Sequence, residues 1–449
     1  MDTYKRNCYT FGMGIMGGEM VFAMVNMFLI FYFTDILIVD INTFIWIIII
    51  MVGLRIFDAF TDPVISALID NTKSRFGKFK PWIAVGSLLS GLFTILLFFD
   101  AGIQGEAFIM GFAILFFLWG IFHSANDIAS WAMLPTLSLN SREREKMNTI
   151  ARVCALIGLF MVFAGIVPIT NMLGETAGGM VGAYSMAAVF VAGIMWFGQL
   201  ITIFGIKEPR GVFLESEHIS LKGMAKIISK NDQLFWIVII MGLFAVGYTT
   251  MITLGIYFFI YVFGDARMFT VFAVIMGISQ MVSLALFPIL VRFLKRKAIY
   301  SIASILTVSG YAVFFFAPMD TITIIGIGTS LIFIGQGGIQ FVMTLFLSDT
   351  IDYGHLKSGK RNDSAAKSIQ PLISKAGGAL SGGIAGITLI LTGIFGGETE
   401  ITADNEDFMI FKIVMLILPL LCVVVGFIIH SLKYKINEIY YQEIIDELL

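Results

Sequence analysis

Long apolar runs alternate with short charged segments along the whole chain. The hydrocarbon core of a bilayer is about 30 Å thick, so a helix needs about 20 apolar residues to cross it. Twelve runs reach that length: 11–34, 42–70, 81–99, 107–137, 149–173, 182–206, 233–263, 268–292, 298–318, 322–350, 367–397 and 408–432. The pattern predicts an all-α integral membrane protein with twelve transmembrane helices.

The composition excludes a soluble protein. Of the 449 residues 58% are hydrophobic and only 13% are charged, whereas a soluble domain carries about a quarter charged residues. The net charge of −2 gives no reason to expect a nucleic-acid partner. Three widely separated cysteines, Cys8, Cys154 and Cys422, predict unpaired thiols and neither a disulfide framework nor a metal site. Glu19 interrupts the first apolar run, so we expect a retained helix rather than a cleaved signal.

Basic residues fall on one side of the predicted spans. Of the 29 lysines and arginines, 24 lie at the termini or in the connections after even-numbered spans. Because such residues concentrate in cytoplasmic segments, we expect both termini in the cytoplasm of a cell-membrane protein. The longest connection, 207–232, separates an N-terminal six-helix half, 1–206, from a C-terminal six-helix half with a short tail, 233–449. Basic loops at matching positions predict two parallel repeats around a central cavity.

The densest group of charges inside a predicted span is LRIFDAFTDPV. Arg55, Asp58 and Asp62 recur at helical spacing and share one face. Two close carboxylates need a neutralising charge from a bound cation, a proton or the arginine. Pro63 frees the carbonyl four residues before it, and Thr61 offers a hydroxyl. Oxygen donors of this kind suit Na⁺ or a proton. The alternative is a structural ion-pair cluster that locks two helices.

A second group, HSANDIASW, lies in the fourth predicted span. His123 and Trp131 are four residues either side of Asp127, on the same helix face. A carboxylate that accepts hydroxyl hydrogen bonds beside an indole that stacks on C–H groups is suited to a sugar. The alternatives are that Trp131 is a packing residue and that His123 is a satisfied polar side chain.

The remaining intramembrane charges are isolated. Glu19 follows two glycines, which allow close backbone approach, and Arg152 and Lys375 are lone cations on spans five and eleven. Charges inside a membrane by default mark a solute or ion path. Lys375 precedes the small-residue segment AGGALSGG, which favours a coupling role. The alternative is that each cation merely neutralises an acid across the cavity.

The basic segments after spans two and four suggest a conformational latch. Asp70, Lys73, Arg75 and Arg142 have the charges to form ion pairs that hold one state, and we assign Asp349 and Asp352 to the same kind of network. The alternative is that these bases are only a topology signal.

Three motifs resemble a known family: RIFDAFTDPVISALIDNTKSRFGKFKPWI, NDIASWAMLPTLSLNSRERE and SDTIDYGH. They are similar to those of the glycoside–pentoside–hexuronide:cation symporters, and the resemblance extends over essentially the whole chain. It implies the major-facilitator fold and uptake of a sugar coupled to Na⁺, Li⁺ or H⁺.

The resemblance also implies roles for individual residues. Asp58 and Asp62 match the family's cation-site carboxylates, with Thr61 and Ser124 at neighbouring ligand positions. Sugar-binding positions correspond to Glu19, Asp127, Trp131, Arg152 and Gln370, and Lys375 matches the coupling lysine. The sequence departs from the family at Gly18, Thr61, His123, Gln340 and Pro371, which leaves the coupling ion and the sugar open.

We therefore expect a secondary active symporter that takes up a glycoside with Na⁺ or H⁺ by alternating access, with the monomer as its functional unit and no cofactor beyond the coupling cation. A carrier of hexuronides or of a lipid-like solute on the same fold is the alternative. An enzyme is disfavoured because no GxSxG or HExxH pattern occurs. A sensor is disfavoured because the twelve spans leave little room for a soluble output domain.

Overall fold

The computed structural model of the protein describes residues 3–138, 140–206, 221–318, 321–359, 363–394 and 406–448. All regular structure in these residues is helical. Twelve helices are long and apolar enough to cross a membrane, so the prediction of an all-α protein with twelve spans is confirmed. The described helices form two compact units, α1–α6 and α7–α15.

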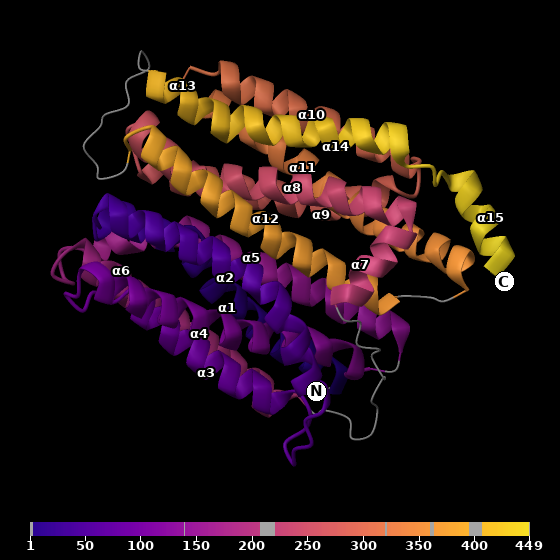
Figure 1. The fold of residues 1–449 in the computed structure, drawn as a ribbon, viewed down its shortest axis with the longest axis horizontal. Helices are drawn as coiled ribbons and strands as arrows, with labels where there is room; N and C mark the ends of the chain where they lie inside the picture. Colours follow the sequence, from indigo (N-terminus) through magenta and orange to yellow (C-terminus); the bar gives the residue numbers. More distant parts are fainter. Residues whose placement is uncertain are drawn as a thin grey trace. The chain divides into compact units, whose positions relative to one another are not determined.

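The first unit holds six long helices, which are drawn in Figure 1. They are α1 (Thr3–Phe31), α2 (Ile41–Asp70), α3 (Lys80–Leu97), α4 (Gly105–Met133), α5 (Ser141–Leu173) and α6 (Met180–Gly205), with a π-helical turn η1 (Tyr32–Ile36) and a 3-10 turn η2 (Leu134–Thr136). Helix α1 packs on α5 and α6, and α4 packs on α2 and α3. Of the apolar windows in these spans α1 has the largest buried share, 72%.

Gly17 allows helix α1 to approach helix α6 closely. A Cβ added to Gly17 on α1 would lie 2.6 Å from the Cα of Met195 on α6, where no real side chain fits. Small residues at such crossings let helix backbones come together in a membrane. This contact fixes the height of α1, and with it the position of Glu19, against α6.

Hydrogen bonds fix the start of α2, the helix that carries the acidic motif. The carboxylate of Asp40 accepts from the backbone N–H of Thr43 at 3.0 Å and from its hydroxyl at 2.6 Å. An aspartate at this N-cap position satisfies a helix N–H that has no partner within the helix. These bonds hold the pKa of Asp40 below its usual range.

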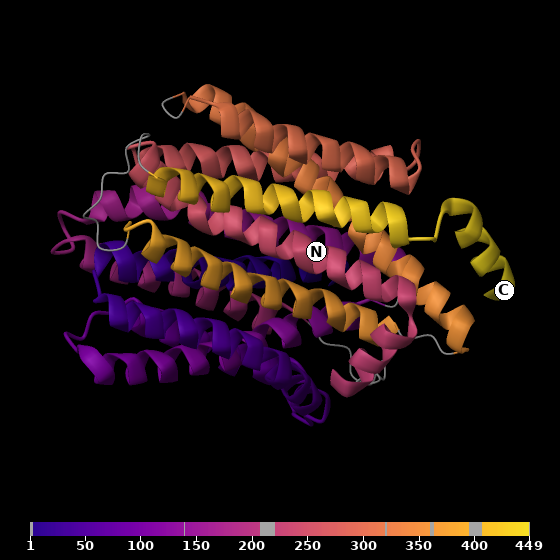
Figure 2. The same cartoon turned by 45° about the horizontal axis from the view of Figure 1, so that its top comes forward.

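The second unit contains the remaining helices (Figure 2). They are α7 (Leu221–Lys230), α8 (Asp232–Tyr257), α9 (Arg267–Leu290), α10 (Arg296–Phe316), α11 (Ile322–Ser358), α12 (Asp363–Leu391), α13 (Glu406–Lys412), α14 (Leu418–Lys433) and α15 (Glu438–Leu448), with π-helical turns η3 (Phe258–Val262) and η4 (Ile413–Ile417). Helix α8 packs on α11, α12 and α14, and α11 packs on α9 and α10.

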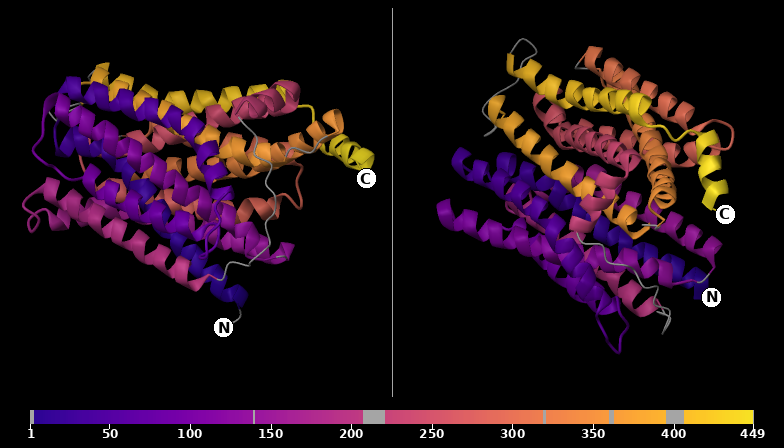
Figure 3. Two further views of the ribbon diagram at one scale, coloured as in Figure 1. Left: turned by 60° about the horizontal axis from the view of Figure 1, so that its bottom comes forward. Right: turned by 45° about the vertical axis from the view of Figure 1, so that its right-hand side comes forward.

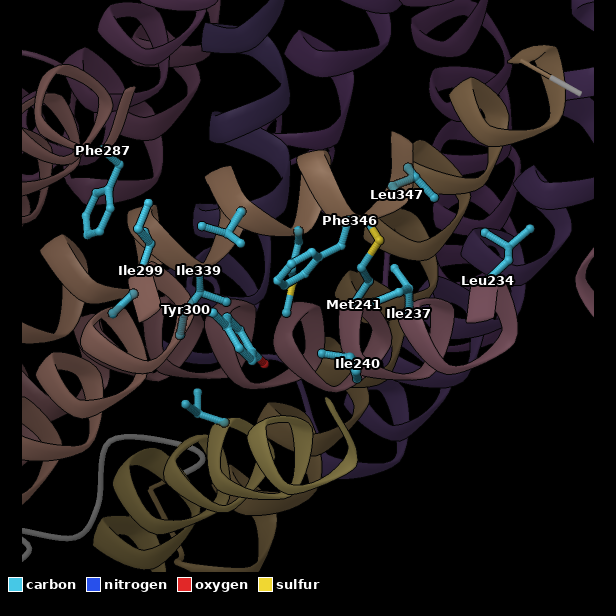
Figure 4. Packing of buried hydrophobic residues seen from close by; sticks show 14 of the residues in the cluster. Leu234, Ile237, Ile240, Met241, Phe287, Ile299, Tyr300, Ile339, Phe346 and Leu347 are labelled. Carbon is cyan, nitrogen blue, oxygen red and sulfur yellow. The ribbon is translucent and has the colours of Figure 1, made fainter. Parts of the chain in front are cut away.

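Apolar side chains from six of these helices form one buried cluster in the second unit (Figure 4). The cluster includes Ile237 of α8, Phe287 of α9, Tyr300 of α10, Phe346 of α11, Ile369 of α12 and Val423 of α14. Dispersion between such closely packed side chains is the main attraction between helices in lipid, where no hydrophobic effect drives them together.

Several helices continue past the apolar runs that predicted them. Helix α5 begins at Ser141 and α11 ends at Ser358, each about eight residues beyond the predicted span. Two short helices, α7 and α15, lie outside all predicted spans, and α15 extends beyond the end of α14 (Figure 3). Hydropathy finds the part of a helix that lies in lipid, and these additions are polar enough to lie outside it.

Candidate functional site

The carboxylate of Asp58 on α2 lies against the backbone of α4. A Cβ added to Gly120 would be 3.3 Å from Asp58 Oδ1 and 3.9 Å from Oδ2. The hydroxyl of Thr61 donates to the backbone carbonyl of Asp58 at 3.2 Å, so its lone pairs remain able to act as acceptors. Asp62 is half-buried one turn further along α2. The Asp58 carboxylate therefore occupies space that is available because Gly120 has no side chain.

Arg55, one turn before Asp58, is buried and bound to more than the acid. Its guanidinium donates to Asn26 Oδ1 on α1 and lies 5.8–5.9 Å from the ring centres of Phe22, Phe116 and Trp119. It is also close enough to Asp58 for the two charges to interact. Aromatic faces attract a cation that has left water. Arg55 is therefore a fixed part of this site that bridges α1, α2 and α4.

His123 is part of an aromatic stack beside Arg55. Its ring is stacked on Phe22 at 5.5 Å and on Trp119 at 5.0 Å, the latter with an interplanar angle of 7°. The indole N–H of Trp119 donates to the Thr94 hydroxyl at 3.0 Å. The stack joins the arginine to the helix that carries Asp127, four residues further along α4.

The structure brings Glu19 and Asp127 together across α1 and α4. Both side chains are half-buried, and their charges are close enough to act on each other. A Cβ added to Gly18 would lie 3.6 Å from the side-chain oxygen of Asn126. Two neighbouring carboxylates can accept several hydroxyl hydrogen bonds from one ligand.

A buried amide pair behind these acids was not predicted from the sequence. The Nε2 of Gln199 on α6 donates to the Gly14 carbonyl of α1 at 3.0 Å and to Asn126 Oδ1 at 3.3 Å. The Nδ2 of Asn126 donates to the Ile83 carbonyl of α3 at 3.2 Å. Two side chains thus join four helices next to Asp127. Their only signal in the sequence is a polar residue within an apolar helix.

The other predicted residues of the first unit, Trp131 and Arg152 for the sugar and Ser124 for the cation, differ in exposure. Trp131 is half-buried against an apolar cluster, which agrees with a packing contribution, and Ser124 is buried at 4% exposure. Arg152 is exposed on α5 and makes no ion pair or hydrogen bond within the residues that the structure describes. A charge exposed within a span normally faces a water-filled path rather than lipid.

Gln370 and Lys375 belong to the second unit. Both side chains are half-buried on α12. Gln370 directly precedes Pro371, and Lys375 lies four residues after it. That proline removes one helix N–H and leaves a carbonyl of the preceding turn without its usual donor. Their roles in binding and coupling stay predictions.

The charge network after α2 uses a partner that the sequence analysis did not single out. Asp70 forms an ion pair with Lys78. Lys73 and Arg142 are exposed, and the guanidinium of Arg75 lies 4.6 Å from the ring centre of Phe76. No ion pair of these three bases occurs in the part of the chain that the structure describes. Among the described residues, the ion pair that could hold one conformation of this segment is therefore that of Asp70 with Lys78.

The corresponding network in the second unit includes the last helix. Asp349 pairs with Arg296, and Asp352 accepts a hydrogen bond from the Tyr441 hydroxyl at 3.0 Å. Burial and the nearby carboxylate raise the pKa of Tyr441 to about 12, so the phenol remains a donor at every physiological pH. The hydroxyl of Tyr434 lies 3.5 Å from Asp349. The ends of α10 and α11 are thus tied to α15.

Comparisons with known proteins identify the family of the chain. The chain is 32% identical to the lactose permease of Lactobacillus delbrueckii subsp. bulgaricus over 88% of its own length and 64% of that protein. It is 28% identical to the raffinose carrier protein of Pediococcus pentosaceus over 98% of its length and 70% of that protein. The chain therefore spans about two thirds of the length of these curated relatives.

A solved structure shares the fold at low sequence identity. The nucleoside transporter NupG matches with a TM-score of 0.66 and 14% identity, over 97% of this chain and 100% of the other. The family described as MFS/sugar transport protein matches residues 10–438. The chain therefore belongs to the MFS/sugar transport protein family, and its resemblance to the glycoside–pentoside–hexuronide:cation symporters is confirmed.

Proposed function

We propose that this chain is a secondary active symporter that takes up a glycoside together with Na⁺ or H⁺ by alternating access. The observation that carries the proposal is the contact of Asp58 with α4 at Gly120. Asp127 follows Gly120 by seven residues, which is two helical turns and the same face. The acid suited to a cation, on α2, therefore lies against the same helix, α4, that carries the acid suited to a sugar.

The cation is proposed to bind at Asp58 and Asp62. Arg55 supplies one positive charge but is also bound by Asn26 and three aromatic rings. One carboxylate charge thus remains for Na⁺ or H⁺ to balance, because water solvates it poorly within a membrane. Thr61 and Ser124 are the additional oxygen donors.

The sugar is proposed to bind between Glu19 and Asp127, which interact across α1 and α4. The carboxylates would accept hydroxyl hydrogen bonds. The other contacts would come from His123, Trp131, Arg152, Gln370 and Lys375. Binding of the cation and of the sugar would then favour each other reciprocally.

A hexuronide is the second candidate substrate. Arg152 is exposed within a span and has no partner among the described residues, so a sugar carboxylate would give it one. A lipid-like solute is less suited, because the site is lined by carboxylates.

We further propose that both termini are cytoplasmic, that the protein lies in the cell membrane and that the monomer is its functional unit. A reporter fused within 210–230 should read cytoplasmic. An external reading would contradict the proposed topology.

Uptake into membrane vesicles tests the proposal. The panel contains lactose, raffinose and a glucuronide, each under an imposed Na⁺ or H⁺ gradient. We expect accumulation of at least one glycoside with one gradient, lost in Asp58→Cys and in Asp62→Cys. The variants should retain sugar binding that no longer depends on the cation. If both variants still accumulate sugar uphill, the acid pair is a structural ion cluster and the coupling site lies elsewhere.

A further inference from the structure

A groove of about 450 Å³ lies in the second unit where two membrane spans end. The span in α9 ends at Leu290 and the span in α10 begins at Arg296. The groove is lined by the connection between them, by Leu345 of α11 and by Glu438 of α15. Because one span ends and the next begins at this groove, we place the groove at the level of the lipid headgroups.

The groove carries an excess of positive charge. Arg292, Lys295 and Arg296 line it, with Glu438 as the acid. The guanidinium of Arg296 is engaged by Asp349. Arg292 and Lys295 are exposed and form no ion pair within the described part of the chain. Two cations are thus available to a ligand from outside.

The carboxylate of Glu438 occupies one edge of the groove. Helix α10 has 21 residues, and its N-cap residue Lys295 makes no side-chain cap. The first backbone N–H, that of Arg296, instead donates to the Glu438 carboxylate at 2.7 Å. The N-terminus of a helix favours negative charge through its free N–H groups and its dipole. The two exposed cations, next to this helix N-terminus, would suit a phosphate beside Glu438.

Apolar side chains adjoin the cations. Phe293 is 79% exposed and Leu294 is 37% exposed, both between Arg292 and Lys295. An exposed aromatic ring of this kind at the end of a span normally lies at the membrane surface. A ligand that fits the groove therefore has an anionic group and an apolar part, which a free phosphate lacks.

We propose that this groove binds the phosphate of an anionic phospholipid between Arg292 and Lys295. Its acyl chains would run along Phe293 and the lipid-facing side of α9 and α10. Basic pockets between membrane helices are suited to such headgroups. This binding is separate from the transport site, because none of the residues that line the groove belongs to the proposed cation or sugar site.

Native mass spectrometry of the detergent-solubilised full chain with added phosphatidylglycerol tests the proposal. We expect one tightly bound phosphatidylglycerol, with binding about 30-fold weaker in Arg292→Gln/Lys295→Gln, as expected for the loss of two basic residues at an anionic surface. Glu438→Gln removes the neighbouring negative charge but keeps an acceptor for the Arg296 N–H, so it should bind about five-fold more tightly.

The matched control is Lys226→Gln/Lys230→Gln, which removes two exposed charges from α7, outside the groove. It should bind phosphatidylglycerol as the unmodified protein does. Equal losses in both double variants would reduce the effect to surface charge and overturn the proposal. Equal binding of phosphatidylcholine would overturn it as well, and so would equally tight binding of inorganic phosphate. Size-exclusion profiles confirm that each variant is folded.

Discussion

A single methyl group on Gly120 should weaken the response to the coupling cation without changing any charge. The added Cβ of Gly120→Ala would lie 3.3 Å from Asp58 Oδ1, closer than the ordinary Cβ contact distance of 3.4–4 Å. The carboxylate must then move by about 0.3 Å. Misplacement of a reacting group by 1 Å costs about 100-fold, which scales to about four-fold for this shift. Gly120→Val, with two more methyl groups, should abolish the response.

The assay is the concentration of Na⁺ or H⁺ that gives half-maximal sugar binding in membrane vesicles. We expect a rise of about four-fold in Gly120→Ala, with maximal sugar binding little changed. Replacing glycine by alanine within a helix also favours the helix by up to about 1 kcal/mol, so the control is Gly111→Ala. Gly111 lies on the same helix, and an added Cβ there would meet nothing within 4 Å. An unchanged half-maximal concentration in Gly120→Ala, or the same rise in Gly111→Ala, would refute the assignment of Asp58.

Two further substitutions test other parts of the structure. Asp127→Asn should weaken sugar binding by about 10- to 100-fold, since a charge-assisted hydrogen bond contributes about 1.5–3 kcal/mol; equilibrium binding of labelled sugar measures this, and normal affinity would mark Asp127 as structural. Tyr441→Phe removes the hydrogen bond to Asp352 and should lower the melting temperature by a few degrees, a loss of about 1.5 kcal/mol. Tyr440→Phe is its control, because the Tyr440 hydroxyl makes no hydrogen bond in the described residues while its ring contact with Tyr353 is retained; equal melting temperatures in the two variants would contradict this.

The spans could be predicted because lipid imposes a strong constraint. A backbone in hydrocarbon must satisfy its own polar groups, so each long apolar run has to be a helix. The ends of α5 and α11 could not be predicted, since outside lipid a helix ends where capping and packing decide. The short helix α15 gave no hydropathy signal, although Ile444 is fully buried.

The sequence pattern also could not predict which residues that are far apart in the chain contact one another. Four bases follow α2 within eleven residues of Asp70, and only the bend of the loop selects Lys78. Asn126 and Gln199 are 73 residues apart, yet they form one hydrogen-bonded pair. The helical spacing of Arg55 and Asp58, by contrast, is local, and the structure keeps their charges close.

The arrangement on α4 would give the proposed coupling of cation and sugar a short physical route. Asp58 of α2 contacts α4 at Gly120. Asp127 follows Gly120 by seven residues, which is about 10 Å along the axis of α4. At an effective dielectric constant of about 20, two unit charges at that separation interact by about 1.7 kcal/mol. A cation at Asp58 would therefore favour the ionised Asp127, which accepts sugar hydroxyl groups, by about 15-fold. We infer that electrostatics along one rigid helix can supply coupling of the usual size, before any contribution from movement between the two units.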